Sequence, residues 1–123
     1  MTKGEMTDTN GLQGRLRHVS PQAAKLYARM VEMSRSGRGQ ARSRDAAYLP
    51  ELYEACGVTV EEMYAYIEEL KSARLIEVEG EYPFEDAKIV DAAEAGALAD
   101  EAAQRKQSLS DVLVELQANR AIG

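Results

Sequence analysis

The alternation of apolar and polar positions predicts a chain built mainly of amphipathic helices. Residues 21–34 carry apolar side chains at helical spacing, and Ser20 and Pro21 suit the cap and the first residue of this helix. A short helix is predicted over 50–56 and a longer one over 60–73. The positions expected to face one core are Ala23, Leu26, Tyr27, Met30, Met33, Leu49, Leu52, Tyr53, Val58, Met63, Ile67 and Leu70.

Local signals define the junction between the two central helices. Thr59 and Glu62 have the spacing of a capping box, in which each side chain accepts a hydrogen bond from the other residue's backbone N–H. Gly57 stands where a helix ends in a left-handed residue, a conformation that glycine adopts without a Cβ penalty. These signals predict a tight turn between the helices.

A β-hairpin is predicted after the second central helix. Residues 75–79 alternate apolar side chains with glutamates, which is typical of a half-buried strand. Gly80 suits a turn, and residues 82–84 are predicted to form a short return strand. This return strand would lie at an edge, because Pro83 has no N–H to donate to a neighbouring strand.

The chain beyond the hairpin allows two interpretations. One starts a helix at Pro83 and ends it near Lys106, since acids at its start and bases at its end match the helix dipole. The other makes residues 87–91 a second strand and lets Asp91 and Glu94 open the next helix. We favour the early start. Both interpretations make residues 92–104 helical.

A last helix is predicted after Ser108, which suits its cap. Its apolar stripe consists of Leu109, Val112, Leu113 and Leu116, at helical spacing. A helix of about three turns is too short to be stable alone in water, so the stripe must be buried. It could pack on the chain's own core or on a second copy, and we expect a homodimer.

The central stretch resembles the winged helix-turn-helix family of transcription regulators. The resemblance is carried by the two helices around Gly57 and by the sequence EELKSARLIEVEG, which matches the end of the family's third helix and its first wing strand. It implies a mainly α fold with a small β-hairpin and a short strand at Ala47-Tyr48 beside the wing. The implied organisation is a flexible N-terminal arm over 1–18, a winged helix-turn-helix core over 19–84 and a C-terminal helical extension over 85–123.

The resemblance also implies DNA binding, with the second central helix in the major groove and the wing on the backbone. The positions that would touch DNA are nearly all acidic, which departs from the family pattern because phosphates repel carboxylates. On the helix they are Glu61, Glu62, Ala65, Tyr66, Glu68, Glu69 and Ser72, and on the wing Glu77, Glu79 and Glu81. The residues left to contact phosphates are Arg35, Arg38, Arg42, Arg44, Lys71 and Arg74.

Charge is distributed unevenly along the 123 residues, a length that suits one domain. Residues 1–44 contain nine basic and three acidic side chains, while the whole chain has a net charge of −6. Residues 34–44, SRSGRGQARSR, have the composition of a mobile loop. This loop is either a solvated linker or an arm that contacts nucleic-acid phosphates, and the sequence leaves both interpretations open.

No constellation of catalytic or metal-binding residues is recognisable. His18 is the single histidine and lies in the predicted arm, so we expect neither a catalytic triad nor a metal or cofactor site. Cys56 is the single cysteine; it is interpreted as a small core residue and fits a reducing cytoplasm. No apolar run reaches the length of a membrane span.

Two functional hypotheses follow. The first is a winged-helix DNA-binding regulator that holds duplex DNA through the basic loop and arm. The second is a protein-interaction module that docks a basic or apolar protein surface and does not bind DNA. Its contacts would come from Glu61, Glu62, Tyr66, Glu68 and Glu69, with the apolar stripe of the last helix serving for pairing.

Overall fold

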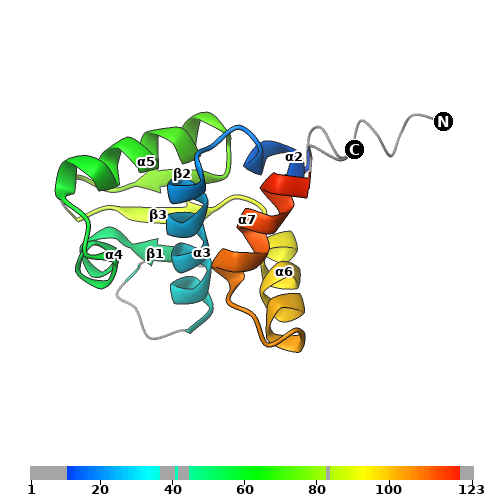
Figure 1. Cartoon of the computed structure of the whole chain (residues 1–123). Helices are drawn as coiled ribbons and strands as arrows, with labels where there is room; N and C mark the ends of the chain where they lie inside the picture. Colours follow the sequence, from blue (N-terminus) through cyan, green and yellow to red (C-terminus); the bar gives the residue numbers. More distant parts are fainter. Residues whose placement is uncertain (1–10, 37–40, 42–44, 83, 120–123) are drawn as a thin grey trace.

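A computed structural model describes residues 11–36, 41, 45–82 and 84–119 (Figure 1). The fold is mainly helical with one small antiparallel sheet, which confirms the coarse fold class. The elements are α2 (Leu12–Leu16), α3 (Pro21–Ser36), β1 (Ala46–Tyr48), α4 (Leu49–Cys56), α5 (Val60–Ser72), β2 (Ile76–Glu79), β3 (Asp86–Ile89), α6 (Ala92–Gln104) and α7 (Leu109–Asn119).

The helix boundaries around α4 and α5 confirm the local sequence signals. Gly57 ends α4 in the left-handed region, with φ of 65°. The Thr59 hydroxyl accepts from the Glu62 backbone N–H at 3.1 Å, and the Glu62 carboxylate accepts from the Thr59 N–H at 3.0 Å. Ser20 likewise accepts from the backbone N–H of Ala23 at 3.2 Å at the start of α3.

The sheet has the strand order β1-β3-β2, so β3 is its central strand. Ala87 of β3 pairs with Ala47 of β1 on one side and with Val78 of β2 on the other. The predicted strand near Ala47 is therefore confirmed. Tyr82 and Phe84 do not belong to the predicted return strand, and Pro83 lies outside the described residues. The Phe84 N–H instead donates to the Glu81 carbonyl at 2.7 Å, a contact typical of a turn.

The early helix start that we favoured after the hairpin is also wrong. The alternative, a strand over 87–91, is confirmed with shifted bounds, since β3 spans Asp86–Ile89. Ala87 and Ile89 are buried on one face of β3 while Lys88 between them is exposed, the period-two pattern of a strand. Helix α6 begins only at Ala92. Asp91 precedes it as predicted by that interpretation, but its carboxylate forms an ion pair with Arg15 and no side-chain cap.

Residues 11–18 do not form the flexible arm that was predicted. Leu12 and Leu16 of α2 are 1% and 0% exposed, so this short helix contributes to the core. Gln117 of α7 fixes the following turn by donating to the carbonyls of Leu16 at 2.8 Å and Val19 at 2.9 Å. Residues 1–10 lie outside the described residues.

The apolar stripe of α7 lies in the core of the single chain. Leu109, Val112 and Leu113 are at most 3% exposed, and Leu116 is half-buried. Helix α3 makes its most extensive contacts with α7, beside which it lies in Figure 1. Leu109, Val112 and Leu113 are thus covered within one chain and are not available for pairing in this conformation, whereas homodimerisation itself stays a prediction. Residue 85 is no domain boundary either, since β3 and α7 complete the core of the preceding residues.

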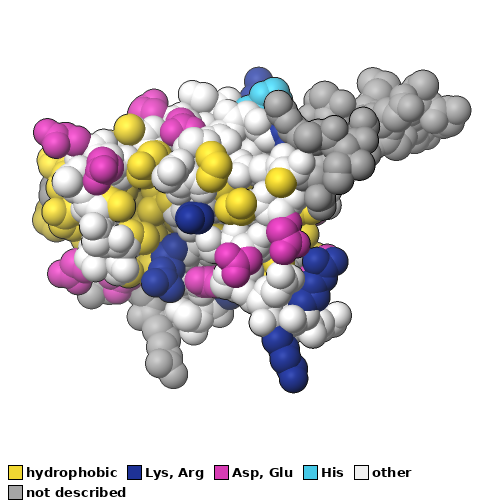
Figure 2. Space-filling model, in the orientation of Figure 1, with side chains coloured by type: hydrophobic (Ala, Val, Ile, Leu, Met, Phe, Trp, Pro, Cys, Tyr) yellow, Lys and Arg dark blue, Asp and Glu magenta, His cyan; other side chains and the backbone are white. Residues whose placement is uncertain are grey.

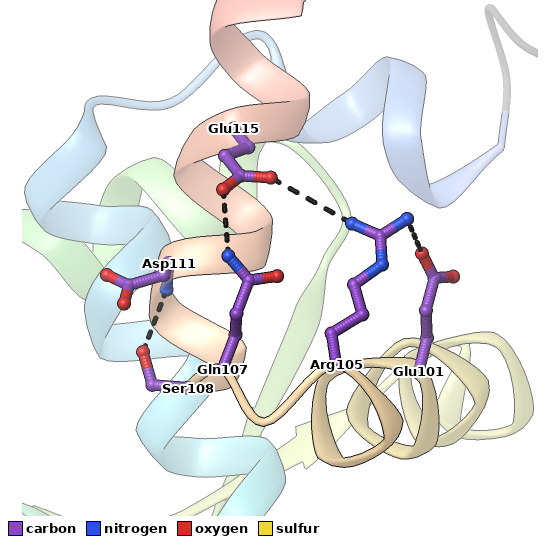
Figure 3. A network of polar contacts seen from close by, with 6 residues as sticks. All are labelled: Glu101, Arg105, Gln107, Ser108, Asp111 and Glu115. Atoms are coloured by element: carbon purple, nitrogen blue, oxygen red, sulfur yellow. Dashed lines mark hydrogen bonds and ion pairs between the residues drawn. The ribbon is translucent and has the colours of Figure 1, made fainter.

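Polar contacts set the turn between α6 and α7 (Figure 3). Ser108 caps α7 as predicted, since its hydroxyl accepts from the Asp111 N–H at 3.1 Å. Arg105 pairs with Glu101 at 2.6 Å and with Glu115 at 3.9 Å. Gln107 also donates to Glu115, at 3.0 Å. These side chains are largely exposed, so they orient the two helices more than they stabilise the fold.

Tyr27 is 1% exposed, and its hydroxyl has no hydrogen-bond partner among the described residues. An unpaired buried hydroxyl costs about 1–3 kcal/mol. We therefore expect Tyr27→Phe to leave the free energy of unfolding at neutral pH unchanged or to raise it by up to about 1 kcal/mol. Urea unfolding followed by circular dichroism measures this, with the exposed Tyr53→Phe as control.

The same variant has a second readout at high pH. Burial raises the pKa of Tyr27 above its ordinary value of 10.0, a rise that Arg15 opposes and Glu94 reinforces. Above that value the unfolded chain loses its tyrosine proton before the folded protein does, so stability falls as pH rises. Tyr27→Phe should make this alkaline loss smaller. A loss of stability at neutral pH would instead show that the hydroxyl has a partner.

Candidate interaction surface

An apolar groove of about 320 Å³ lies where α4, the start of α5 and the hairpin loop meet. The hairpin loop is the segment between β2 and β3 that contains Glu81, Tyr82, Phe84 and Glu85. Helix α4 contributes Leu49, Pro50, Tyr53 and Glu54, helix α5 contributes Val60, Met63 and Tyr64, and the loop contributes Tyr82 and Phe84. The capped turn between α4 and α5 brings the two helices together at this end of the molecule. Three separate segments thus converge on one concave apolar surface.

Tyr64 and Glu85 hold the hairpin loop against the helices. The rings of Tyr64 and Tyr82 pack at a tilt of 55° with centroids 5.6 Å apart. The Tyr64 hydroxyl donates to the Glu85 carboxylate at 2.6 Å, and the Leu49 N–H donates to the Glu85 carbonyl at 2.9 Å. Burial raises the pKa of the Tyr64 hydroxyl, as does this hydrogen bond to a carboxylate. The loop is therefore tied to both α4 and α5.

The groove carries most of the large apolar side chains that the described residues expose. Tyr82 is 67% exposed, Phe84 57%, and Tyr53 and Val60 38% each. The prediction of Tyr53 as a core residue is wrong, because it lies on the side of α4 that faces the groove. Leu49, Leu52, Met63, Ile67 and Leu70 are buried as predicted, and Val58 is half-buried.

Carboxylates surround this apolar surface. Glu54 lines the groove itself, Glu61 and Glu62 follow Val60 in the first turn of α5, and Glu81 precedes Tyr82. Among the described residues that line the groove there is no lysine or arginine. Figure 2 shows hydrophobic surface with acidic side chains around it at the end of the molecule where α4 and the start of α5 lie.

The predicted acidic contact residues of α5 divide into two groups. Glu61, Glu62 and Glu68 are exposed, as a docking role requires. Glu68 pairs with Lys71 at 3.1 Å, and one oxygen of Glu62 accepts from the Thr59 N–H at 3.0 Å. Glu69 is not free to bind a partner protein, because it accepts from the Ser20 backbone N–H at 2.7 Å and from its hydroxyl at 3.2 Å. Its carboxylate therefore joins α5 to the start of α3.

Tyr66 is the one aromatic residue among the predicted protein contacts. It is half-buried and lines a different cleft, on the side of α3. It does not belong to the groove. The groove's own aromatic side chains were missed by sequence reasoning. The signal that could have found them is the sequence EYPF, in which two aromatics flank a proline directly after a predicted turn.

The three described residues among those predicted to contact nucleic acid, Arg35, Lys71 and Arg74, do not lie in one basic patch. Arg35 lies in α3, since this helix extends to Ser36, and pairs with Asp100 at 2.6 Å. Lys71 and Arg74 lie at the C-terminal end of α5, which is close to the N-terminal end of α3. Arg35 lies at the other end of α3, about 20 Å away along the helix axis. Arg38, Arg42 and Arg44, and most of the predicted loop, lie outside the described residues.

Arg35 lies over Gly96 of α6. A Cβ placed on Gly96 would come within 2.6 Å of the Arg35 guanidinium, which crosses this helix toward Asp100. Arg35 therefore contacts the chain's own surface, which lowers its value as a phosphate ligand.

Within the described part of the chain, no three His, Cys, Asp or Glu side chains are grouped to hold a metal ion. Nor does any helix described here have both the length and the apolar character needed to span a bilayer. Comparisons with family models, curated proteins and solved structures find no match to this chain.

Proposed function

We propose that this protein is a winged-helix interaction module that docks a segment of another protein in the groove between α4, α5 and the hairpin loop. The observation that carries the proposal is the cluster of exposed apolar side chains, Tyr53, Val60, Tyr82 and Phe84, with carboxylates around it. Exposed apolar patches with polar rims are typical of protein-binding sites.

The order of elements supports the winged-helix part of the proposal. A helix (α3) is followed by a short strand (β1), a helix pair joined by a tight turn (α4 and α5) and two antiparallel strands (β2 and β3). In this arrangement Glu81, Tyr82 and Phe84, which lie between β2 and β3, would belong to the wing. The groove thus lies between the second helix of the turn and the wing, the two parts with which such domains contact their partners.

Charge and size define the chemistry of the partner. A groove of about 320 Å³ suits an aromatic or large aliphatic side chain as an anchor. The surrounding glutamates favour lysine or arginine beside that anchor, and they attract it mainly at low salt. The proposed partner is therefore a segment with an apolar anchor flanked by basic side chains.

Duplex DNA is a second candidate, supported by the same order of elements. The exposed face of α5 weakens it, because Glu61, Glu62 and Glu68 would face the phosphates. Its positive contacts would fall to Lys71 and Arg74, together with arginines that lie outside the described residues. We therefore place protein docking first and include DNA in the test.

Selection from a random phage-displayed peptide library tests the docking proposal. We expect enriched peptides to combine an aromatic or large aliphatic residue with lysine or arginine. Their affinity should fall by about tenfold or more for Tyr82→Ser combined with Phe84→Ser, because buried aromatic anchors contribute most of the binding energy at interfaces. Neutralising Glu54, Glu61 and Glu81 to glutamine should weaken binding and flatten its salt dependence.

Two valines provide a closely matched control. Val60, in the groove, is 38% exposed and Val90, outside it, is 40% exposed. Val60→Ser should weaken the selected peptides and Val90→Ser should not. Equal affinity for all variants would refute docking in the groove. Binding of random duplex DNA at low salt that survives loss of Tyr82 and Phe84 would favour the second candidate.

A further inference from the structure

A second cleft, of about 530 Å³, lies between α3, the turn after α4 and the start of α7. Its apolar lining includes Leu26 and Ala28 of α3, Val58 of the turn and Tyr66 of α5. Leu26 and Ala28 are buried, and Val58 and Tyr66 are half-buried. The cleft shares no lining residue with the docking groove.

The rim of this cleft is basic, in contrast to the groove. Lys25 and Arg29 line it from successive turns of α3, one helical turn apart and therefore on the same face. Figure 2 shows basic side chains over α3 beside hydrophobic surface. Both cations belong to residues 1–44, the part of the chain in which basic side chains outnumber acidic ones.

Few internal partners neutralise these two cations. Lys25 is exposed and has no ion pair or hydrogen-bond partner within the part of the chain that the structure describes. Arg29 faces Glu32 at 3.6 Å, a contact between half-exposed side chains that is long and therefore weak. Glu32 is the one acid among the described residues that line the cleft.

Hydroxyl groups also line the cleft. They belong to Ser108 and Ser110, at the start of α7. Ser108 uses its oxygen to cap α7, which leaves its O–H free to donate to a ligand. The cleft thus offers charged and neutral donors at its rim and an apolar lining between them.

We propose that this cleft binds a small amphipathic anion, an aromatic or branched aliphatic carboxylate. The apolar body would pack on Leu26, Val58 and Tyr66, and the carboxylate would accept hydrogen bonds from Lys25 and Arg29. The volume lies within the range of small-molecule sites, about 300–1,000 Å³. This inference does not depend on the docking proposal.

Two fluorescent probes with nearly the same apolar body test the charge requirement. The anilinonaphthalene sulfonate ANS carries one negative charge, whereas N-phenyl-1-naphthylamine carries none. We expect the full chain to bind one ANS per molecule. Combining Lys25→Gln with Arg29→Gln should weaken ANS binding by about tenfold or more and change the affinity for the neutral probe by less than about twofold.

The control variant combines Lys88→Gln with Lys106→Gln, which changes net charge equally at exposed residues outside the cleft. It should bind ANS like the unmodified protein. Ala55→Trp, which adds bulk at an exposed position of the lining, should weaken both probes. Circular dichroism establishes that each variant is folded.

The proposal is overturned if ANS does not bind, or if the Lys25 and Arg29 variant binds it as tightly as the control does. It is also overturned if Tyr82→Ser with Phe84→Ser abolishes ANS binding, since the probe would then occupy the docking groove. If the Lys25 and Arg29 variant weakens the binding of both probes equally, the cleft does not select for a negative charge, and the proposal is likewise refuted.

Discussion

Removal of residues 108–123 is expected to unfold the whole domain. This truncation deletes α7, whose Leu109, Val112 and Leu113 are almost completely buried. It would expose the side of α3 on which α7 packs and would take Gln117 from the carbonyls after α2. Each large aliphatic side chain lost from a core costs about 2–5 kcal/mol, and a domain of this size has about 5–15 kcal/mol in total. The truncated chain should show no cooperative thermal unfolding.

A point variant gives the same test in graded form. Leu113→Ala should lower the free energy of unfolding by about 2–5 kcal/mol, because Leu113 is 1% exposed. Val114→Ala, one residue further along α7 and only half-buried, should cost about 1 kcal/mol or less. Urea unfolding measures both.

Sedimentation of the full and truncated chains could contradict the prediction that truncation unfolds the domain. A dimer that becomes a folded monomer after truncation would show that α7 pairs two chains. That result would contradict the position of the stripe between α7 and α3.

The features predicted correctly from sequence are those fixed by neighbouring residues. The capping box of Thr59 and Glu62 and the left-handed Gly57 set the α4–α5 junction through contacts within a few residues, so spacing alone identifies them. Ser108 marks the start of α7 for the same reason. Such signals need no knowledge of the rest of the fold.

The errors occurred where a long-range contact outweighs a local signal. The acids at 85 and 86 resemble a first helical turn, yet pairing on both sides makes β3 a central strand. Leu12 and Leu16 are too few to give a periodic pattern, although both are buried by packing.

The candidate groove could be predicted only in part. Glu61 and Glu62 were expected to be exposed, and they are. Tyr53 fits the apolar stripe of its helix, so periodicity places it in the core, and only the position of the hairpin loop shows that this side of α4 borders a groove. The convergence of α4 and α5 with Tyr82 and Phe84 is a property of the tertiary fold.

Substitution of Arg15 is the second change for which we expect a large loss of stability. The sequence showed this residue only as part of a basic N-terminal segment. Its guanidinium joins three parts of the chain. Nη1 donates to the carbonyl of Arg74 at 2.6 Å, at the corner between α5 and β2. Nη2 pairs with the carboxylate of Asp91, before α6, and Nε donates to the carbonyl of Gly11 at 3.2 Å.

The Arg74 corner makes this contact more than a surface ion pair. Arg74 has a positive φ of 61°, an uncommon conformation for a residue with a side chain, so the corner needs support from the surrounding structure. The side chain of Arg15 is only 16% exposed, and that of Asp91 33%. Removing the guanidinium would leave a partly buried carboxylate and a carbonyl without this donor.

Arg15→Met is therefore expected to lower the free energy of unfolding by about 2–3 kcal/mol, the range for losing charged hydrogen bonds in a partly buried site. Arg17→Met is the matched control, because Arg17 is exposed two residues away and the change in charge is the same. It should cost less than about 0.5 kcal/mol. Arg15→Lys should fall between the two, since an ammonium keeps the charge but cannot donate in three fixed directions. If Arg15→Met unfolds at the same urea concentration as Arg17→Met, the guanidinium does not hold the corner. Helix α2 would then be fixed by the packing of Leu12 and Leu16 and by the hydrogen bonds from Gln117.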